Sequence, residues 1–149
     1  MNDASLDTIL TELQGSEAGP IVIALRNLGK GLAGLGPADL RRAVEVLCDL
    51  FYIDMADRPD MQPALECAEE ALVAAGAPVV PILISMMEGS DIKSHLHLAG
   101  VLGRIGIPSL QALRRMIATA EDPYSRSFAL YAVGKIRSVE VHEALPEVE

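Results

Sequence analysis

Three glycines in the segment GKGLAGLG, residues 29–36, have the spacing G-x-G-x-x-G of a phosphate-binding loop. Such a loop uses glycines because its backbone must approach a pyrophosphate closely, and it needs a strand before it and a long helix after it. Here residues 26–28 separate the preceding apolar run from Gly29, and Pro37 interrupts any helix that begins at Leu32. A nucleotide-binding loop is therefore disfavoured. We expect the segment to be a helix-ending linker and a place for hinge motion.

The histidines and nearby carboxylates are the candidate metal ligands. His95 and His97 are two residues apart, so on a helix they point in nearly opposite directions and cannot share one ion. Asp91 lies four residues before His95 and shares its face, so the two could ligate together or form a hydrogen bond that locks a turn. We favour the turn-locking pair. His142 and Glu143 supply too few ligands for a transition metal, so no metal site and no cofactor are predicted.

The chain also lacks a recognisable nucleophile. Cys48 and Cys67 fall within apolar periodic runs and match no Cys-x-x-Cys pattern, so we interpret both as buried structural thiols. The serines occur near helix ends, without the G-x-S-x-G elbow of hydrolases. No catalytic residue is predicted, and we interpret the chain as non-enzymatic.

Composition and charge narrow the class of partner. Half of the 149 residues are apolar but only 3% are aromatic, which favours closely packed helices over a sandwich or a barrel. A net charge of -9 disfavours binding to nucleic acid or to an acidic membrane surface. The longest uncharged stretch is broken by glycine and proline, so no membrane span is predicted. Because the sequence does not begin with a secretory signal, we expect a cytoplasmic protein with free thiols.

An internal repeat is the most informative pattern in the sequence. Residues 71–78 read ALVAAGAP, residues 101–108 read VLGRIGIP and residues 132–137 read AVGKIR, so the three segments follow one another at nearly equal spacing. Each segment ends one helix at or near a glycine, and the first two enter the next helix through a proline. A helical hairpin of this length cannot bury its apolar face alone, so we expect about nine helices in stacked hairpins. The inward positions predicted for the later second helices are Leu98, Val101, Leu102, Ile105, Ala129, Ala132, Val133 and Ile136.

The first half of the chain is helical by the same spacing but less regular. One short apolar stripe runs from Leu6 to Leu13, and a second helix is predicted over residues 20–28, where the glycines stop it. A third helix is predicted over residues 38–54.

These segments resemble the HEAT repeat, in particular the short bacterial subclass found in phycobilisome-lyase-like proteins. The best-matching segment is LGRIGIP at residues 102–108, and the resemblance is strong over residues 61–137 and weak over residues 1–60. It implies an all-α fold, a right-handed α-solenoid of about four to five HEAT-like helical hairpins. The predicted organisation is one domain, residues 1–149, made of an irregular N-terminal hairpin (1–36), three repeats (37–76, 77–106 and 107–137) and a C-terminal capping helix (138–149).

The resemblance also implies an ion pair at the turn inside a repeat, between an Asp and an Arg early in the second helix. Asp122 and Arg126 match that pattern, and Asp91 with His95 is its counterpart in the preceding unit. HEAT-type deoxyhypusine hydroxylases hold two irons with several His-Glu pairs, whereas this chain has a single such pair at residues 142–143.

In such a solenoid the second helices of successive hairpins line one face, which predicts where a partner binds. The residues expected on that surface are Glu66, Glu70, Lys93, His97, Arg104, Tyr131 and Lys135. Their charge grades from acidic to basic along the row, a pattern able to orient a charged partner. We expect a non-catalytic protein-protein interaction or assembly scaffold. The alternatives are a subunit of a bilin-lyase-like or cofactor-handling chaperone complex, and self-association through an open end of the solenoid.

Overall fold

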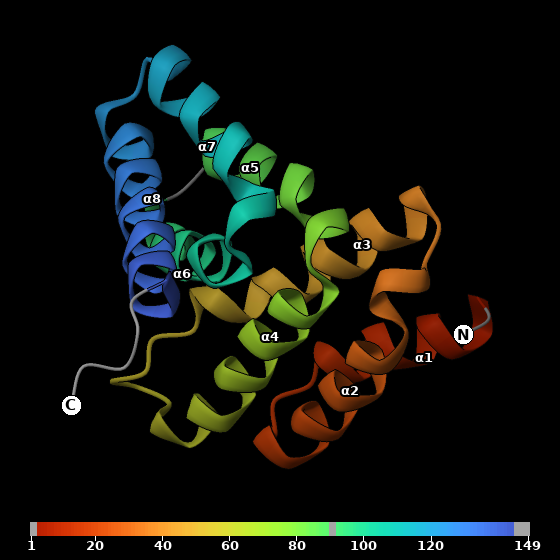
Figure 1. The fold of residues 1–149 in the computed structure, drawn as a ribbon. Coiled ribbons are helices and arrows are strands. Elements are labelled where there is room, and N and C mark those ends of the chain that lie inside the picture. The colour runs from red at the N-terminus through yellow and green to blue at the C-terminus, as the bar shows by residue number, and fades with distance from the viewer. Residues whose placement is uncertain (1–2, 90–91, 145–149) are drawn as a thin grey trace. The chain divides into compact units, whose positions relative to one another are not determined.

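The computed structural model describes residues 3–89 and 92–144, and all regular structure in those segments is helical (Figure 1). The described residues form eight α-helices joined by short turns, so the all-α prediction is confirmed with one helix fewer than the nine expected. The chain divides into two compact units, Met1–Val79 and Val80–Glu149.

Unit 1 contains two pairs of helices that follow one another along the chain. The helices are α1 (Asp3–Leu13), α2 (Ala18–Gly31), α3 (Pro37–Cys48) and α4 (Gln62–Ala75), with 3₁₀ turns η1 (Leu32–Gly34), η2 (Asp49–Tyr52), η3 (Pro59–Met61) and η4 (Ala77–Val79). The first helices of the two pairs, α1 and α3, are in contact, and so are the second helices, α2 and α4. Within this unit, like helices of successive pairs therefore lie against each other.

Unit 2 repeats that arrangement. Its helices are α5 (Val80–Gly89), α6 (His95–Ile105), α7 (Ile107–Thr119) and α8 (Pro123–Ala144), with the 3₁₀ turn η5 (Ile92–Ser94) before α6. Here α5 contacts α7, α6 contacts α8, and α7 and α8 pack together as a pair. The helix α8 continues without a break to Ala144, past residue 138, where the sequence predicts a new capping helix.

The buried side chains follow the helical spacing read from the sequence. In unit 1 the largest fully buried ones are Leu6, Ile21, Leu25, Leu28, Leu32, Leu47, Phe51, Met61 and Leu72. In unit 2, Leu98, Val101, Leu102, Ala129, Ala132 and Ile136 are buried as predicted, whereas Ile105 and Val133 are half-buried. Each fully buried Leu, Ile or Phe stabilises the fold by about 1.5–3 kcal/mol relative to an exposed one.

The turn between helix pairs has the same backbone conformation in two successive copies. Gly76 has φ 71° and ψ -137°, and Gly106, at the equivalent place in the next copy, has φ 87° and ψ -137°. Each glycine N–H donates to a carbonyl of the preceding helical turn, that of Leu72 or Leu102, at 3.2 Å. Because L-residues rarely adopt this region of φ and ψ, both positions require glycine.

The glycine-rich segment departs from the prediction that glycines 29–31 end the second helix. In the structure α2 continues through Gly29 to Gly31 and is followed by the 3₁₀ turn of η1. The reason is packing: Leu28 and Leu32 are both fully buried, and Gly29 lies next to Ala71 of α4. This burial outweighs the cost of about 1 kcal/mol for a glycine inside a helix.

The third helix is also shorter than predicted. It ends at Cys48 and gives way to the 3₁₀ turn of η2, so that residues 38–54 do not form one α-helix. In that turn Leu50 and Phe51 remain buried. A change to 3₁₀ winding, with three residues per turn, is frequent at the C-terminal end of an α-helix.

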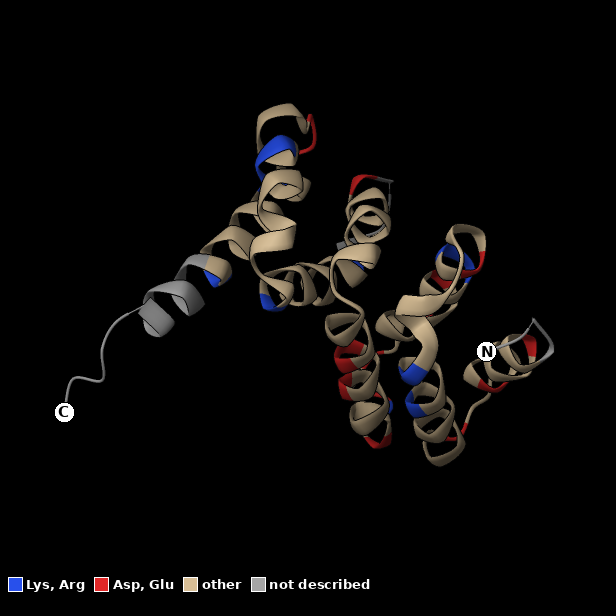
Figure 2. Cartoon of the chain, turned by 45° about the vertical axis from the view of Figure 1, so that its right-hand side comes forward, with Lys and Arg blue, Asp and Glu red and all other residues tan. Residues whose placement is uncertain are grey.

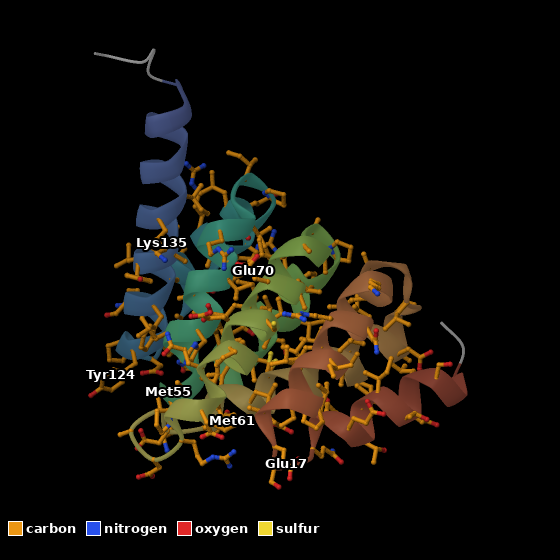
Figure 3. The ribbon with its side chains drawn as sticks, turned by 90° about the horizontal axis from the view of Figure 1, so that it is seen from below. Glu17, Met55, Met61, Glu70, Tyr124 and Lys135 are labelled. Carbon is orange, nitrogen blue, oxygen red and sulfur yellow. The ribbon has the colours of Figure 1, made fainter. Side chains whose placement is uncertain are left out.

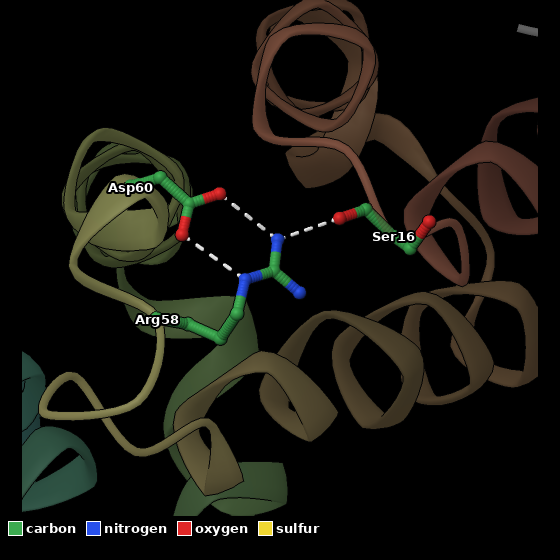
Figure 4. Close-up of polar contacts among 3 residues, drawn as sticks. All are labelled: Ser16, Arg58 and Asp60. Carbon is green, nitrogen blue, oxygen red and sulfur yellow. Dashed lines mark hydrogen bonds and ion pairs between the residues drawn. The ribbon is translucent and has the colours of Figure 1, made fainter.

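Arg58 links two segments of unit 1 that are far apart in the sequence, one at Ser16 and one at Asp60 (Figure 4). Its Nε and Nη2 atoms donate to the two carboxylate oxygens of Asp60, each at 3.0 Å, and Nη2 also donates to the Ser16 carbonyl oxygen at 2.6 Å. The hydrogen bond and charge of Arg58 lower the pKa of the exposed Asp60 carboxyl below its usual value. Arg58 thereby joins the turn between α1 and α2 to the start of η3.

Candidate binding surfaces

The seven residues predicted to bind a partner are divided between the two units. Glu66 and Glu70 are exposed on α4 in unit 1, where Glu66 accepts a hydrogen bond from Gln62 at 3.1 Å. The other five belong to unit 2: Lys93 lies in η5, His97 and Arg104 lie on α6, and Tyr131 and Lys135 lie on α8. Among these five only His97 is half-buried, and the rest are exposed.

Tyr131 and Lys135, two of the predicted residues, are in direct contact on α8. The Lys135 ammonium lies 5.6 Å from the centre of the Tyr131 ring, within range of a cation–π interaction. The α8 helix approaches α6 closely here, because a Cβ atom at Gly103 would lie only 2.7 Å from the Lys135 Cβ. The aliphatic part of Lys135 therefore packs on α6 while its charge remains exposed.

An exposed leucine beside Tyr131 was not predicted. Leu130 is 53% exposed and Tyr131 is 45% exposed, so α8 presents two large side chains to solvent, and one of them, Tyr131, contacts Lys135. The sequence signal for Leu130 is that it falls outside the predicted inward set, although an apolar residue in a helix is more often buried. Tyr124, labelled with Lys135 in Figure 3, is a further exposed side chain near the start of α8.

The predicted turn pair of Asp122 and Arg126 stabilises its turn in a different way. Asp122 accepts hydrogen bonds from the Tyr124 N–H and the Ser125 hydroxyl, each at 3.1 Å. Arg126 donates instead to the Ala120 carbonyl oxygen at 2.6 Å, at the end of α7. Both residues thus satisfy backbone groups at helix ends: Asp122 caps α8 and Arg126 neutralises the carbonyl end of α7.

His95 is a core residue of unit 2. Its imidazole is fully buried on α6, and its ring meets the Phe128 ring edge to face, with centroids 5.4 Å apart. Its predicted turn partner, Asp91, lies outside the described residues, as do the side chains of His142 and Glu143.

A depression of about 350 Å³ lies where α5 and α7 end and α8 begins. Its rim carries the carboxylates of Glu88, Glu121 and Asp122. At its edge the buried Ser125 hydroxyl oxygen lies 3.0 Å from the Met87 carbonyl oxygen, so its one hydrogen is shared between that carbonyl and Asp122. In residues 3–89 and 92–144, the structure brings together no group of three or more His, Cys, Asp or Glu side chains able to hold a metal ion.

The two cysteines have different environments. Cys48 is fully buried on α3, and burial, together with the charges of Asp49 and Glu45, raises the pKa of its thiol far above the usual value. Cys67, predicted to be buried as well, is half-buried and borders an open groove between α2 and α4. Both cysteines are free thiols.

Comparison with known proteins does not place the chain in a family. A scan against models of protein families finds no match, and a search of curated proteins finds none. In the described part of the chain, no single helix is long and apolar enough to cross a membrane; residues 59–75 and 77–88 meet the length and composition criteria only as a bent pair.

Proposed function

We propose that the chain is a non-catalytic protein-binding module whose hairpins continue into a HEAT-like, right-handed α-solenoid. The support for repetition is local. Like helices of successive pairs contact each other in both units, and the turns at Gly76 and Gly106 share one backbone conformation. Stacked hairpins of this kind serve as scaffolds because they present rows of equivalent side chains on an extended surface.

The observation that carries the proposal is the exposed face of α8 around Tyr131. Leu130 and Tyr131 place apolar and aromatic area in solvent, and Lys135 adds a positive charge beside the ring. Aromatic side chains dominate the binding energy of protein interfaces, since they bury a large area with few rotatable bonds. We infer that Tyr131 is the anchor of a protein interface and that Leu130 extends its apolar centre.

The charge around Tyr131 selects the partner. Lys135 on α8 and Arg104, which follows Gly103 on α6, are both exposed and both basic. A partner surface with an apolar centre and an acidic rim would complement this face, whereas a basic partner would be repelled.

Affinity capture with matched variants tests the proposal. The tagged wild-type chain and the Leu130→Ser/Tyr131→Ser variant are used to capture partners from the native cell, and Tyr124→Ser is the control because Tyr124 is also exposed on the same helix. We expect one stoichiometric protein with the wild type and the control, and its loss with the double variant. Equal recovery with all three chains would contradict the proposal, and a co-purified chromophore or metal would favour a cofactor-handling subunit.

A further inference from the structure

A second surface lies in unit 1, where α2 and α4 enclose an open groove of about 500 Å³. Its floor consists of small residues, Gly29 on α2 with Ala71 and Ala74 on α4, and the half-buried Cys67 borders it. The lining is mainly apolar. A groove with a floor of small side chains has room for a large apolar side chain from outside.

Close helix packing creates this groove. A Cβ atom at Gly29 would lie 3.6 Å from the Ala71 Cβ, which is ordinary van der Waals contact. Neither residue projects far enough to fill the space above the two helices, so the groove remains open to solvent. Its shape is therefore part of the helix-helix packing, and it needs no rearrangement to receive a ligand.

Two cations of α2 border the groove. Arg26 and Lys30 are four residues apart, so they lie on the same side of the helix, and both are exposed. Within residues 3–89 and 92–144, neither side chain forms a hydrogen bond or an ion pair. The basic residues of α2 lie beside the acidic residues of α4 (Figure 2). Positive charge therefore lies on the α2 side of the groove, and the carboxylate of Glu70, which also lines the groove, lies on the α4 side.

From this arrangement we propose that the groove between α2 and α4 binds an amphipathic helix of a partner protein, anchored by one large apolar side chain and carrying a carboxylate one turn away. The apolar side chain lies over Gly29 and Ala71, and the carboxylate pairs with Arg26 and Lys30. Helices bind grooves in this way through anchors spaced three, four or seven residues apart. The charged residues of the lining are two cations on α2 and one carboxylate, Glu70, on α4, so a carboxylate of the partner is favoured on the α2 side of the groove.

The geometry argues against two other occupants. A second copy of the chain, related by a two-fold axis, would set one concave groove against another and leave both floors unfilled. An acyl chain would fit the apolar floor, but the open groove would leave much of it in water, so it would gain little from burial. A helix covers the floor and reaches the cations at the same time.

The proposal is independent of the α8 surface. Its test uses the full chain and follows the signals of residues in unit 1. The probe is a synthetic helical peptide with a leucine stripe flanked by glutamates, and its twin has lysines in place of the glutamates. We expect the acidic peptide to shift the NMR amide signals of Gly29, Ala71 and Ala74 and to slow alkylation of Cys67. The lysine twin should do neither.

Charge reversal provides the decisive comparison. In Arg26→Glu/Lys30→Glu we expect affinity for the acidic peptide to fall about tenfold or more and affinity for the lysine twin to rise. The control Arg114→Glu/Arg115→Glu changes the net charge equally on exposed positions of α7 and should leave binding unchanged. Circular dichroism confirms that each variant is folded. Ala74→Leu, which fills the exposed side of the groove, should also block the acidic peptide.

Several results would overturn the proposal. One is the absence of groove shifts at millimolar acidic peptide, and another is equal binding by the charge-reversed and wild-type chains. Competition by dodecanoate, with dodecanol as the uncharged control, would identify an acyl-chain site. A groove-dependent dimer in sedimentation would identify a second copy. Because the α8 variants of the capture experiment do not alter α2 or α4, failure of either proposal leaves the other testable.

Discussion

Gly103 on α6 faces Lys135 on α8 so closely that a Cβ atom at position 103 would lie 2.7 Å from the Lys135 Cβ and 3.3 Å from the Ala132 carbonyl oxygen. The only way to admit a methyl group is to move the two helices apart, because the Lys135 Cβ is fixed to the backbone. The contact explains why α6 and α8 can pack tightly beneath the exposed Tyr131. It also makes position 103 a sensitive probe of unit 2.

Gly103→Ala should destabilise the protein by about 1–2 kcal/mol, since overpacking a helix interface costs more than the higher helix propensity of alanine returns. Gly100→Ala is the matched control on the same helix, because a Cβ atom there meets nothing within 4 Å. It should stabilise the protein by about 0.5–1 kcal/mol. Urea unfolding of both variants gives the free energies, and a Gly103→Ala variant as stable as the wild type would refute the close approach.

Gly76→Ala and Gly106→Ala should each destabilise the protein by about 1–3 kcal/mol, because alanine is strained at the positive φ of these turns. Gly19→Ala, at a position where a Cβ meets nothing and φ is not positive, should not destabilise it. Thermal unfolding followed by circular dichroism compares the three variants. We expect similar losses of stability at positions 76 and 106 because the two glycines share one backbone conformation. An alanine variant at either position that is as stable as the wild type would contradict the strain.

The turns at Gly76 and Gly106 were predictable because their signals are local. A helix end marked by glycine and followed by proline depends on residues within one turn of the chain, and the two copies agree both in sequence and in the hydrogen bond that each glycine makes. The inward apolar positions were predictable for the same reason, since helical spacing relates residues three and four apart.

The course of α2 through Gly29 was not predictable from local propensity. Its continuation depends on Ala71, which lies two helices further along the chain and packs against Gly29. The groove bordered by Arg26 and Lys30 depends on the same long-range pairing of α2 with α4. Sequence spacing indicates that the two cations share a helix face but does not indicate which helix lies opposite.

One of the two thiols should react in the native protein. Cys67 is half-buried beside the groove, whereas the buried Cys48 has a raised pKa and so carries almost no thiolate at neutral pH. Mass spectrometry after brief treatment with iodoacetamide should show a single adduct, on Cys67. Cys67→Ser should abolish it, Cys48→Ser should leave it unchanged, and rapid labelling of Cys48 would contradict the burial.

The carboxyl group of Asp60 should titrate below its unfolded pKa of 3.8, because Arg58 stabilises the charged form. A carboxyl group whose pKa is lower in the folded state stabilises that state when the pH is above the unfolded pKa. This stabilisation is lost as the pH falls through the folded pKa. NMR titration should show the Asp60 pKa rising toward 3.8 in Arg58→Gln. It should not move in Arg41→Gln, which removes an exposed guanidinium from an unconnected ion pair on α3. An identical titration in all three proteins would rule out the Arg58 contact.

The bridge from Arg58 to the Ser16 carbonyl joins distant backbone segments, and the chain between them contains α2 and α3. We expect fraying of the turn after α1 to loosen the start of η3 as well, because the same guanidinium binds both segments. We therefore expect the amides next to Ser16 and Asp60 to exchange hydrogen in one cooperative opening event, although nothing in the order of the sequence connects them.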